Sequence, residues 1–278
     1  YMDKFFNTEN KFPRGQTRKE LTAMSASDRQ EFQLDGADRI VIDGHYTLLD
    51  SPLDFPVLQN ELSFFQTFRH LLPPDCTKLG KYIEQILQER KGQAVGVEFG
   101  GVGINVFSGF SHNFFKKSVG VTLVDHRMAS WVESDNLKIK KEGLKHEVME
   151  GDIFMPETYE KLKQKIGGEK VDLIFERMVR GLEFVPVDPY VVSQTLNTWY
   201  QLLNEGGIMF VQVPNAFSSL LMEWANLIEE QYKDVLDFKY GKDNKSFATY
   251  VFRLRKLHGA PDSLPLLTPR KLKDLNMY

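Results

Sequence analysis

The feature that most restricts the fold of this chain is an apolar strand followed at once by a glycine-rich turn, within the stretch Ala94–Asp125. The apolar run Ala94–Phe99 is typical of a parallel strand that is covered on both faces. The glycines after it allow a tight turn whose backbone N–H groups approach a ligand closely. A second apolar run, Ser118–Val124, ends at Asp125. The stretch therefore predicts a strand, a turn, a helix and a second strand, with a nucleoside-binding crevice at the carboxyl ends of the strands.

The candidate ligand-binding residues lie at the two strand ends. The turn contains Gly100, Gly101 and Gly103, and Asp125 follows Gly103 by 22 residues. In βαβ units, an acid about 20 residues after such a turn binds ribose hydroxyls. Glu98 lies inside the apolar strand, where a charge needs a partner that a ligand or backbone N–H groups can supply. The alternative is that the glycines only end a strand and that Asp125 caps a helix, because a short glycine pattern is weak by itself.

Composition sets the class of protein. The chain has 278 residues, 42% hydrophobic and 26% charged, which suits one large α/β domain with an appended piece or two small domains. A net charge of −3 argues against a dedicated nucleic-acid binder. The single cysteine, Cys76, excludes an intrachain disulfide and indicates a reducing compartment. No apolar run is long enough to span a bilayer, and the first residues are too polar for a signal peptide, so we expect a cytoplasmic protein without membrane contact.

Strands and helices alternate after the first strand, which predicts a doubly wound, mostly parallel seven-stranded sheet with helices on both faces. Phe107, Phe110 and Phe114 recur at helical spacing and predict the helix between the first two strands. The other predicted strands cover 145–150, 171–175, 208–213, 235–240 and 247–255. The other predicted helices cover 79–90, 128–141, 157–166 and 217–232, and a further helix begins at Asp188-Pro189.

The chain divides into three predicted parts. Residues 1–75 form an N-terminal extension or substrate cap, residues 76–255 the main domain and residues 256–278 a C-terminal tail. The extension contains a predicted hairpin at Arg39–Leu49 and a helix at Val57–Leu72. His45 and Tyr46, beside the hairpin turn, are either substrate contacts or exposed turn residues.

Polar residues lie at the ends of five successive predicted strands. They are Glu98, Asp125, Asp152, Glu176 and Asn215. Because parallel strands end at one edge of the sheet, we expect these side chains to cluster there around an adenosine. Some acids at these positions are also expected as helix caps.

Residues 94–255 resemble the class I S-adenosylmethionine-dependent methyltransferases in element order and in the segments VGVEFGGVG, VTLVDH, EGDIF, VDLIFERMV and LLNEGGIMFV. The resemblance implies a Rossmann-like methyltransferase fold with S-adenosylmethionine as the cofactor. It implies that Glu98 and the glycine turn lie under the methionine part and that Asp125 holds the ribose hydroxyls. It further implies that Asp152 meets the adenine amino group, that Ile153 packs on the ring, that His126 flanks the adenine, and that Glu176 lies near the cofactor amine or the substrate.

The sequence departs from the family in two places. The family's glycines alternate after the acid, whereas here Val102 and Ile104 occupy two of those places. The fourth strand is followed by Glu176-Arg177 instead of an Asn-Pro-Pro-Tyr segment, which speaks against methylation of an amino group of adenine or of a glutamine amide.

The function that follows is methyl transfer to an unidentified acceptor, expected to be a small molecule, with no identified general base. His45 and His112 are unplaced candidates for the base, and Arg177 or Arg180 for holding an anionic substrate. No spacing of ligands indicates a metal. One alternative is an NAD-dependent oxidoreductase, for which Asp125 and Gly101-Val102-Gly103 fit but Val106 replaces the third glycine. The other is a non-catalytic binding or scaffold module. Oligomeric state is not encoded in any pattern of the sequence.

Overall fold

The structure is a computed structural model, and it describes residues 67–101, 103–122, 137, 139–140, 143, 145–151, 153, 155–177, 189–213, 218–243 and 249–265. The predicted hairpin at Arg39–Leu49 and most of the predicted helices at 57–72 and 128–141 lie outside these residues.

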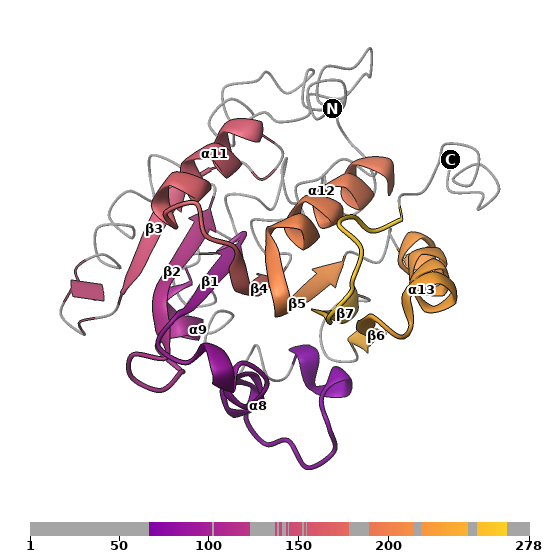
Figure 1. Cartoon of the computed structure of the whole chain (residues 1–278), viewed down its shortest axis with the longest axis horizontal. Coiled ribbons are helices and arrows are strands. Elements are labelled where there is room, and N and C mark those ends of the chain that lie inside the picture. The colour runs from indigo at the N-terminus through magenta and orange to yellow at the C-terminus, as the bar shows by residue number, and fades with distance from the viewer. Residues whose placement is uncertain are drawn as a thin grey trace, which may run out of the picture.

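Seven strands form a single sheet in the order β3-β2-β1-β4-β5-β7-β6 (Figure 1). Their bounds are Ala94–Phe99 (β1), Phe115–Thr122 (β2), His146–Glu150 (β3), Val171–Arg177 (β4), Leu203–Val213 (β5), Leu236–Asp243 (β6) and Thr249–Lys256 (β7). Strands β1 to β5 pair in parallel, and β7 is antiparallel to both β5 and β6. This confirms the predicted doubly wound, mostly parallel seven-stranded sheet.

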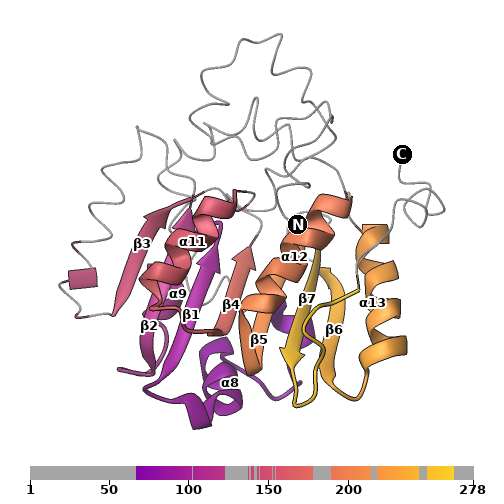
Figure 2. The ribbon, with the colours of Figure 1, turned by 45° about the horizontal axis from the view of Figure 1, so that its top comes forward.

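The longer helices cover the sheet on both faces, since each carries an apolar stripe that must be buried. Helices α11 (Pro156–Lys165) and α12 (Pro189–Leu202) lie in front of the sheet in Figure 2, and α13 (Ser218–Tyr232), which stands beside β6, contributes to the same core. Helix α8 (Leu79–Ile86), the short helix α9 (Ile104–Phe107) and the 3-10 turn η2 (Arg69–Leu71) contribute to the core on the other face. A second 3-10 turn, η3 (Gln88–Arg90), leads from α8 into β1.

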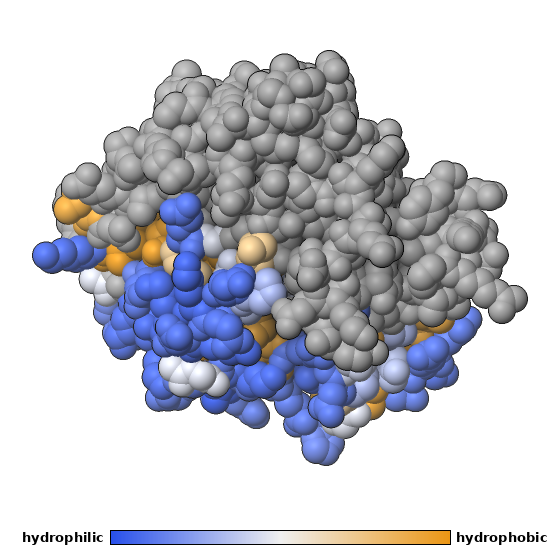
Figure 3. Space-filling view, turned by 90° about the horizontal axis from the view of Figure 1, so that it is seen from above, coloured by the Kyte–Doolittle hydropathy of each residue, from blue (hydrophilic) through white to orange (hydrophobic). Residues whose placement is uncertain are grey.

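Each face of the sheet has an apolar core in which aromatic rings dominate. Under α11 and α12, the rings of Phe99 and Trp199 are stacked with centroids 4.8 Å apart. On the opposite face, Phe68 packs against Phe175 and Phe210, with centroids 6.3 and 5.3 Å away. Phe68 lies in the predicted N-terminal extension, so the core of the sheet includes the end of that segment. Where the described surface is visible in Figure 3 it is mostly hydrophilic, which fits the burial of the apolar side chains in these two cores.

The segment that connects β1 to β2 differs from the predicted helix. Helix α9 ends at Phe107, and Phe114 lies directly before β2, which begins three residues earlier than Ser118. Glycine is a poor helix former, and Gly109 follows α9 within two residues. Asn113 then adopts a left-handed backbone with φ of 57°. The phenylalanine spacing was helical, but these two residues end the helix after one turn.

The segment after β7 has no regular secondary structure, yet it is fixed along α12 and α13. The N–H of Leu264 donates to Asn197 Oδ1 at 2.8 Å, and Leu264 is buried. The Tyr200 hydroxyl donates to the Pro261 carbonyl at 2.6 Å, and the Trp224 indole donates to the Pro265 carbonyl at 2.8 Å. Residues 257–265 therefore belong to the folded domain.

The described part of the chain contains neither a helix that could span a membrane nor a cluster of metal-binding side chains. Within that part of the chain, none of the helices combines the length and the apolarity needed to cross a bilayer. Nor do the described His, Cys, Asp and Glu residues form a group that suits a metal ion. Cys76 has a free, half-buried thiol.

Candidate functional site

The order of the strands locates a crevice in this sheet. From β1 the chain crosses to β2 and β3 on one side, and then returns to β4 and β5 on the other side of β1. In open α/β sheets, ligands bind outside the carboxyl ends of the strands at such a switch point. Phe99, the last residue of β1, pairs in register with Glu176 of β4, so the two strands end at nearly the same level.

The glycine turn lies at this switch point and has a backbone that side chains would not tolerate. Gly100 and Gly103 have φ values of 80° and 74°, in the left-handed region that favours glycine. The N–H of Gly100 donates to the Val121 carbonyl of β2 at 2.8 Å, which fixes the turn to the neighbouring strand. The Gly103 carbonyl accepts from the N–H groups of Val106 and Phe107 at 3.1 and 3.0 Å and starts α9. The irregular spacing of the glycines is therefore compatible with an ordered turn.

Glu98 packs directly against this turn. Its side chain is buried, and a Cβ atom added at Gly101 would lie 2.4 Å from its carboxylate. Real Cβ atoms do not approach other atoms that closely, so only glycine fits at position 101 while the carboxylate stays where it is. The buried acid in β1 and the absence of a side chain at Gly101 are thus one structural feature.

Glu176 is also buried at the carboxyl end of its strand, but on the other face of the sheet. Glu176 is in register with Phe99, whereas Glu98 is in register with Phe175. Because successive residues of a strand point to opposite faces, the two glutamates lie on either side of the sheet. The two glutamates therefore lie at the same edge of the sheet, on opposite faces of it.

Ile153, the predicted adenine neighbour, lies in the core under α11 and α12. Its carbonyl accepts a hydrogen bond from the Tyr159 hydroxyl at 2.6 Å, and that hydroxyl accepts from the Trp199 indole at 3.0 Å. The Tyr159 and Trp199 pair was not predicted as part of the site. Both residues lay on predicted helices, but nothing in their spacing indicated that they meet beside the segment after β3.

A second pair missed by the sequence analysis lies beneath the turn. Ser118 Oγ and His146 Nδ1 are 2.8 Å apart, and both side chains are buried. A Cβ at Gly103 would lie 2.6 Å from His146 Cε1, so the imidazole touches the turn from below. Ser118 and His146 are register partners in β2 and β3. Two polar residues in neighbouring predicted strands were the available signal, but the register that joins them is set by the fold.

Several predicted site residues lie outside the described part of the chain, namely Asp125, His126, Asp152, Asn215, Arg180 and His45. The backbone of Arg177 pairs with Gln212 in β5. His112 lies in the exposed turn between α9 and β2. That turn precedes β2 and is therefore at the opposite end of the strand from the crevice.

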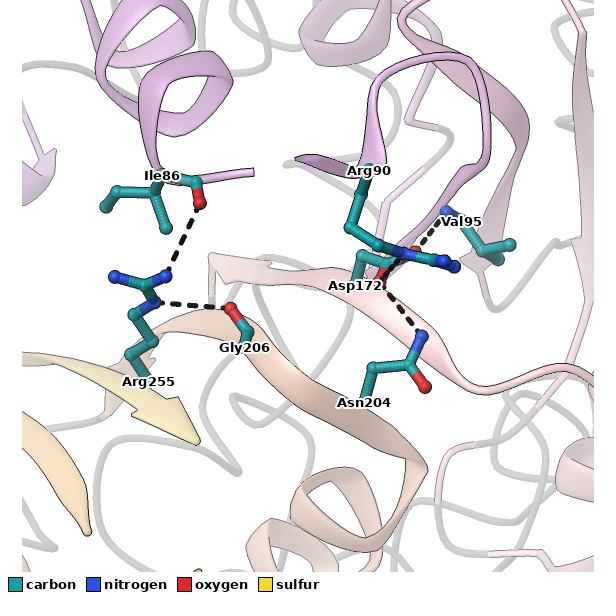
Figure 4. A network of polar contacts seen from close by, with 7 residues as sticks. All are labelled: Ile86, Arg90, Val95, Asp172, Asn204, Gly206 and Arg255. Atoms are coloured by element: carbon teal, nitrogen blue, oxygen red, sulfur yellow. Dashed lines mark hydrogen bonds and ion pairs between the residues drawn. The ribbon is translucent and has the colours of Figure 1, made fainter. Parts of the chain in front are cut away.

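Another buried carboxylate occupies the opposite end of the sheet (Figure 4). Asp172, at the start of β4, accepts from Arg90 Nε at 2.9 Å, the Val95 N–H at 2.8 Å and Asn204 Nδ2 at 2.9 Å. The hydrogen bond that Arg90 donates to Asp172 raises the pKa of the Arg90 guanidinium above its usual value. In the same view, Arg255 donates to the carbonyls of Gly206 and Ile86 at 3.2 and 3.4 Å. The charge of Asp172 is thus compensated within the protein.

The comparisons with known proteins give matches in structure only. No protein-family model matches this chain, and no curated protein matches it in sequence. An rRNA methylase from Streptococcus thermophilus is 11% identical with a TM-score of 0.43, over 66% of this chain and 99% of that one. The O-methyltransferase TomG from Streptomyces achromogenes, in complex with SAM, is 13% identical with a TM-score of 0.41, over 81% of this chain and 100% of that one. An O-methyltransferase from Bacillus cereus, in complex with SAH, is 15% identical with a TM-score of 0.40, over 77% of this chain and 97% of that one.

The sheet itself defines the fold. Its order, with five parallel strands and a closing antiparallel strand β7 between β5 and β6, is the Rossmann-like methyltransferase fold that the resemblance implied. The class of fold predicted from the sequence is confirmed.

Proposed function

We propose that this protein is an S-adenosylmethionine-dependent methyltransferase whose donor site is the glycine turn between β1 and α9. The observation that carries the proposal is the contact between the Glu98 carboxylate and Gly101 at the switch point of the sheet. Three of the four residues of this turn are glycines, which present backbone without side chains. Gly100 and Gly103 are left-handed, and a Cβ at Gly101 would overlap the Glu98 carboxylate, so the three glycines form a backbone cradle. Such a cradle fits the methionine part of the donor, with backbone N–H groups directed at its carboxylate.

The bound donor supplies a methyl group that is already activated on a sulfonium centre. The remaining task of the chain is to align an acceptor with that methyl group, and positioning of this kind contributes about 7–11 kcal/mol at its upper end. Glu98 orders the turn from inside β1. Asp125 is proposed to hold the ribose hydroxyls, and Asp152, Ile153 and His126 to surround the adenine. Glu176, buried at the end of β4, is proposed to lie near the donor amine or the acceptor.

The order of the strands favours this proposal over an NAD-dependent oxidoreductase. The dinucleotide-binding order is 3-2-1-4-5-6 in a mostly parallel sheet. Here an antiparallel strand, β7, lies between β5 and β6. The third glycine of the dinucleotide fingerprint is also replaced, by Val106.

Calorimetric titration with S-adenosylmethionine, S-adenosylhomocysteine and NAD tests the donor. We expect both sulfur nucleosides to bind at one site and NAD not to bind. Glu98→Gln should weaken the binding of both by at least about tenfold, because a charged partner of the turn is lost. Glu169→Gln removes an exposed carboxylate that pairs with Lys116 and is the matched control. Binding of NAD alone would favour the oxidoreductase, and binding of none of the three would favour a scaffold module.

We further propose that the acceptor is a small molecule and that residues 1–56 cover it. The net charge of −3 supports an acceptor other than a nucleic acid. A protein lacking residues 1–56 should bind the donor normally and lose turnover, and unchanged turnover would contradict the cap. Transfer of a radiolabelled methyl group in a cell extract should label the small-molecule fraction. Label in RNA instead would overturn this part of the proposal and leave the donor site standing.

A further inference from the structure

Helix α9 is too short to cover the strands beside it. A helix of four residues is about 6 Å long, whereas a strand of eight residues such as β2 spans about 26 Å. Below α9, the face of the sheet over β2 and the start of β3 is covered by the turn 108–114 and by phenylalanine rings. A pocket remains there, lined by residues that include Phe107, Phe110, Phe115, Ser118, Lys145 and His146.

The walls of this pocket are aromatic and rigid. The ring of Phe115 meets those of Phe107 and Phe110 nearly at right angles, with centroids 5.2 and 4.9 Å away. At the mouth, Ser111 is fixed by Glu84 of α8, which accepts from the Ser111 hydroxyl at 2.9 Å. The cavity has a volume of about 50 Å³. That is room for roughly four water molecules.

The polar groups of the pocket are basic or neutral. Its described lining contains Lys145, His112 and the buried His146, together with serines and an asparagine, but no aspartate or glutamate. The buried pair of Ser118 and His146 lines the same pocket. Aromatic walls select a flat apolar ring, since ring edges carry partial positive charge and ring pairs attract. Cationic and hydroxyl donors beside those walls select an anion on that ring.

His146 connects this pocket to the glycine turn. Its imidazole lines the pocket and also lies against Gly103, where a Cβ would come within 2.6 Å of Cε1. The imidazole is also in contact with the ring of Phe107 in α9, with centroids 5.5 Å apart. A ligand that displaces His146 therefore acts on the turn, and by linkage a ligand of the turn acts on the pocket to the same extent.

We propose that this pocket is a second binding site, for a small aromatic carboxylate, and that its occupant changes the affinity of the glycine turn for its ligand through His146. The site itself is independent of the proposed donor. The coupling rests on the proposed function, because it requires the turn to bind the donor.

Benzoate is the probe, titrated into the full chain by calorimetry, with benzamide as the neutral analogue of the same shape. We expect benzoate to bind at one site and benzamide at least about fivefold more weakly. Lys145→Gln should weaken benzoate about fivefold, as expected for a partly exposed ion pair. Lys163→Gln, an exposed lysine of α11 outside the pocket, is the matched control and should have no effect.

A second variant tests the floor of the pocket. Ser118→Ala removes the hydroxyl partner of His146 and should also weaken benzoate. No binding of benzoate, equal binding of benzamide, or an affinity that neither variant changes would overturn the site.

The coupling is measured as the affinity for S-adenosylhomocysteine with and without saturating benzoate, and we expect a change of at least about fivefold. An unchanged affinity would overturn the coupling. If S-adenosylhomocysteine does not bind at all, the proposed donor fails, and the benzoate titrations still decide whether the pocket is a site.

Discussion

The two ends of the β1–β4 strand pair both contain buried carboxylates, but they differ in what surrounds them. At the amino end, Asp172 is held by a guanidinium, a backbone N–H and a side-chain amide, all from the protein. At the carboxyl end, Glu98 presses on a glycine turn that leaves no room for a Cβ. A buried acid alone therefore does not identify a site. An acid that contacts a glycine-rich turn at the switch point of the sheet is better evidence for a binding site.

The largest effect on stability is expected at the amino end. Asp172→Ala leaves the Val95 N–H and the Asn204 amide without their acceptor and should lower the free energy of unfolding by about 3 kcal/mol. Asn204→Ala removes one of the donors and should cost about 1 kcal/mol. Urea unfolding measures both, and neither variant should change donor affinity. A loss of donor affinity in folded Asp172→Ala would show that the two ends are coupled.

Gly101→Ala should act on both stability and binding. The new methyl group forces the Glu98 carboxylate to move, at a cost of about 1–3 kcal/mol. Donor affinity should fall at least tenfold, roughly 1.4 kcal/mol or more. Adding Glu98→Ala to Gly101→Ala should recover stability without recovering affinity. Normal donor affinity in Gly101→Ala would contradict the assignment of this turn.

Gly103→Ala and Gly168→Ala separate backbone strain from contact. Both glycines have φ of 74°, but a Cβ at Gly168 meets nothing within 4 Å, whereas one at Gly103 meets His146. Gly168→Ala should cost about 1 kcal/mol from the left-handed backbone alone, and Gly103→Ala about 1 kcal/mol more. Thermal unfolding compares the two. Equal losses of stability in the two variants would mean that the His146 side chain moves aside at little cost. That result would weaken the proposed coupling between the pocket and the turn.

The smallest effect on stability is expected for Glu147, a surface carboxylate of β3 that lies at neither end of the β1–β4 pair. Hydrogen bonds from Lys117 and Lys165 lower the pKa of Glu147 below its usual value of 4.5. Glu147 therefore adds stability above about pH 4.5, and this contribution is lost as the pH falls through the lowered pKa. Since its side chain is 43% exposed, Glu147→Gln should cost only about 0.5 kcal/mol at neutral pH. In urea unfolding at a series of pH values, the difference from the parent protein should shrink as the pH is lowered from about 7 toward about 3. A difference that does not shrink would have another origin.

The fold was predictable because its signals are local. Apolar runs, the capping pair Asp188-Pro189 and the glycine turn each report on a few neighbouring residues, and their order determines the topology. The helix between β1 and β2 was predicted over Phe107, Phe110 and Phe114, but it ends at Phe107. The helical spacing of the phenylalanines did not reveal that Gly109 and Asn113 end the helix.

The site was only partly predictable because its contacts depend on register between strands. Glu98 and Glu176 were identified from their positions, but the face each one occupies follows from the pairing of Phe99 with Glu176. The pairing of Ser118 with His146 joins residues 28 positions apart, and that of Arg90 with Asp172 joins residues 82 positions apart. No periodicity within one element encodes such pairs.

The segment 257–265 has a consequence for how this protein can be shortened or tagged. Its hydrogen bonds to Asn197, Tyr200 and Trp224 join this segment to α12 and α13, two helices that β5 separates in the sequence. Amides in α12 and α13 should therefore exchange with deuterium as one cooperative unit. A truncation before Pro261 would open both helices at once, whereas a label attached after Pro265 would leave this unit intact.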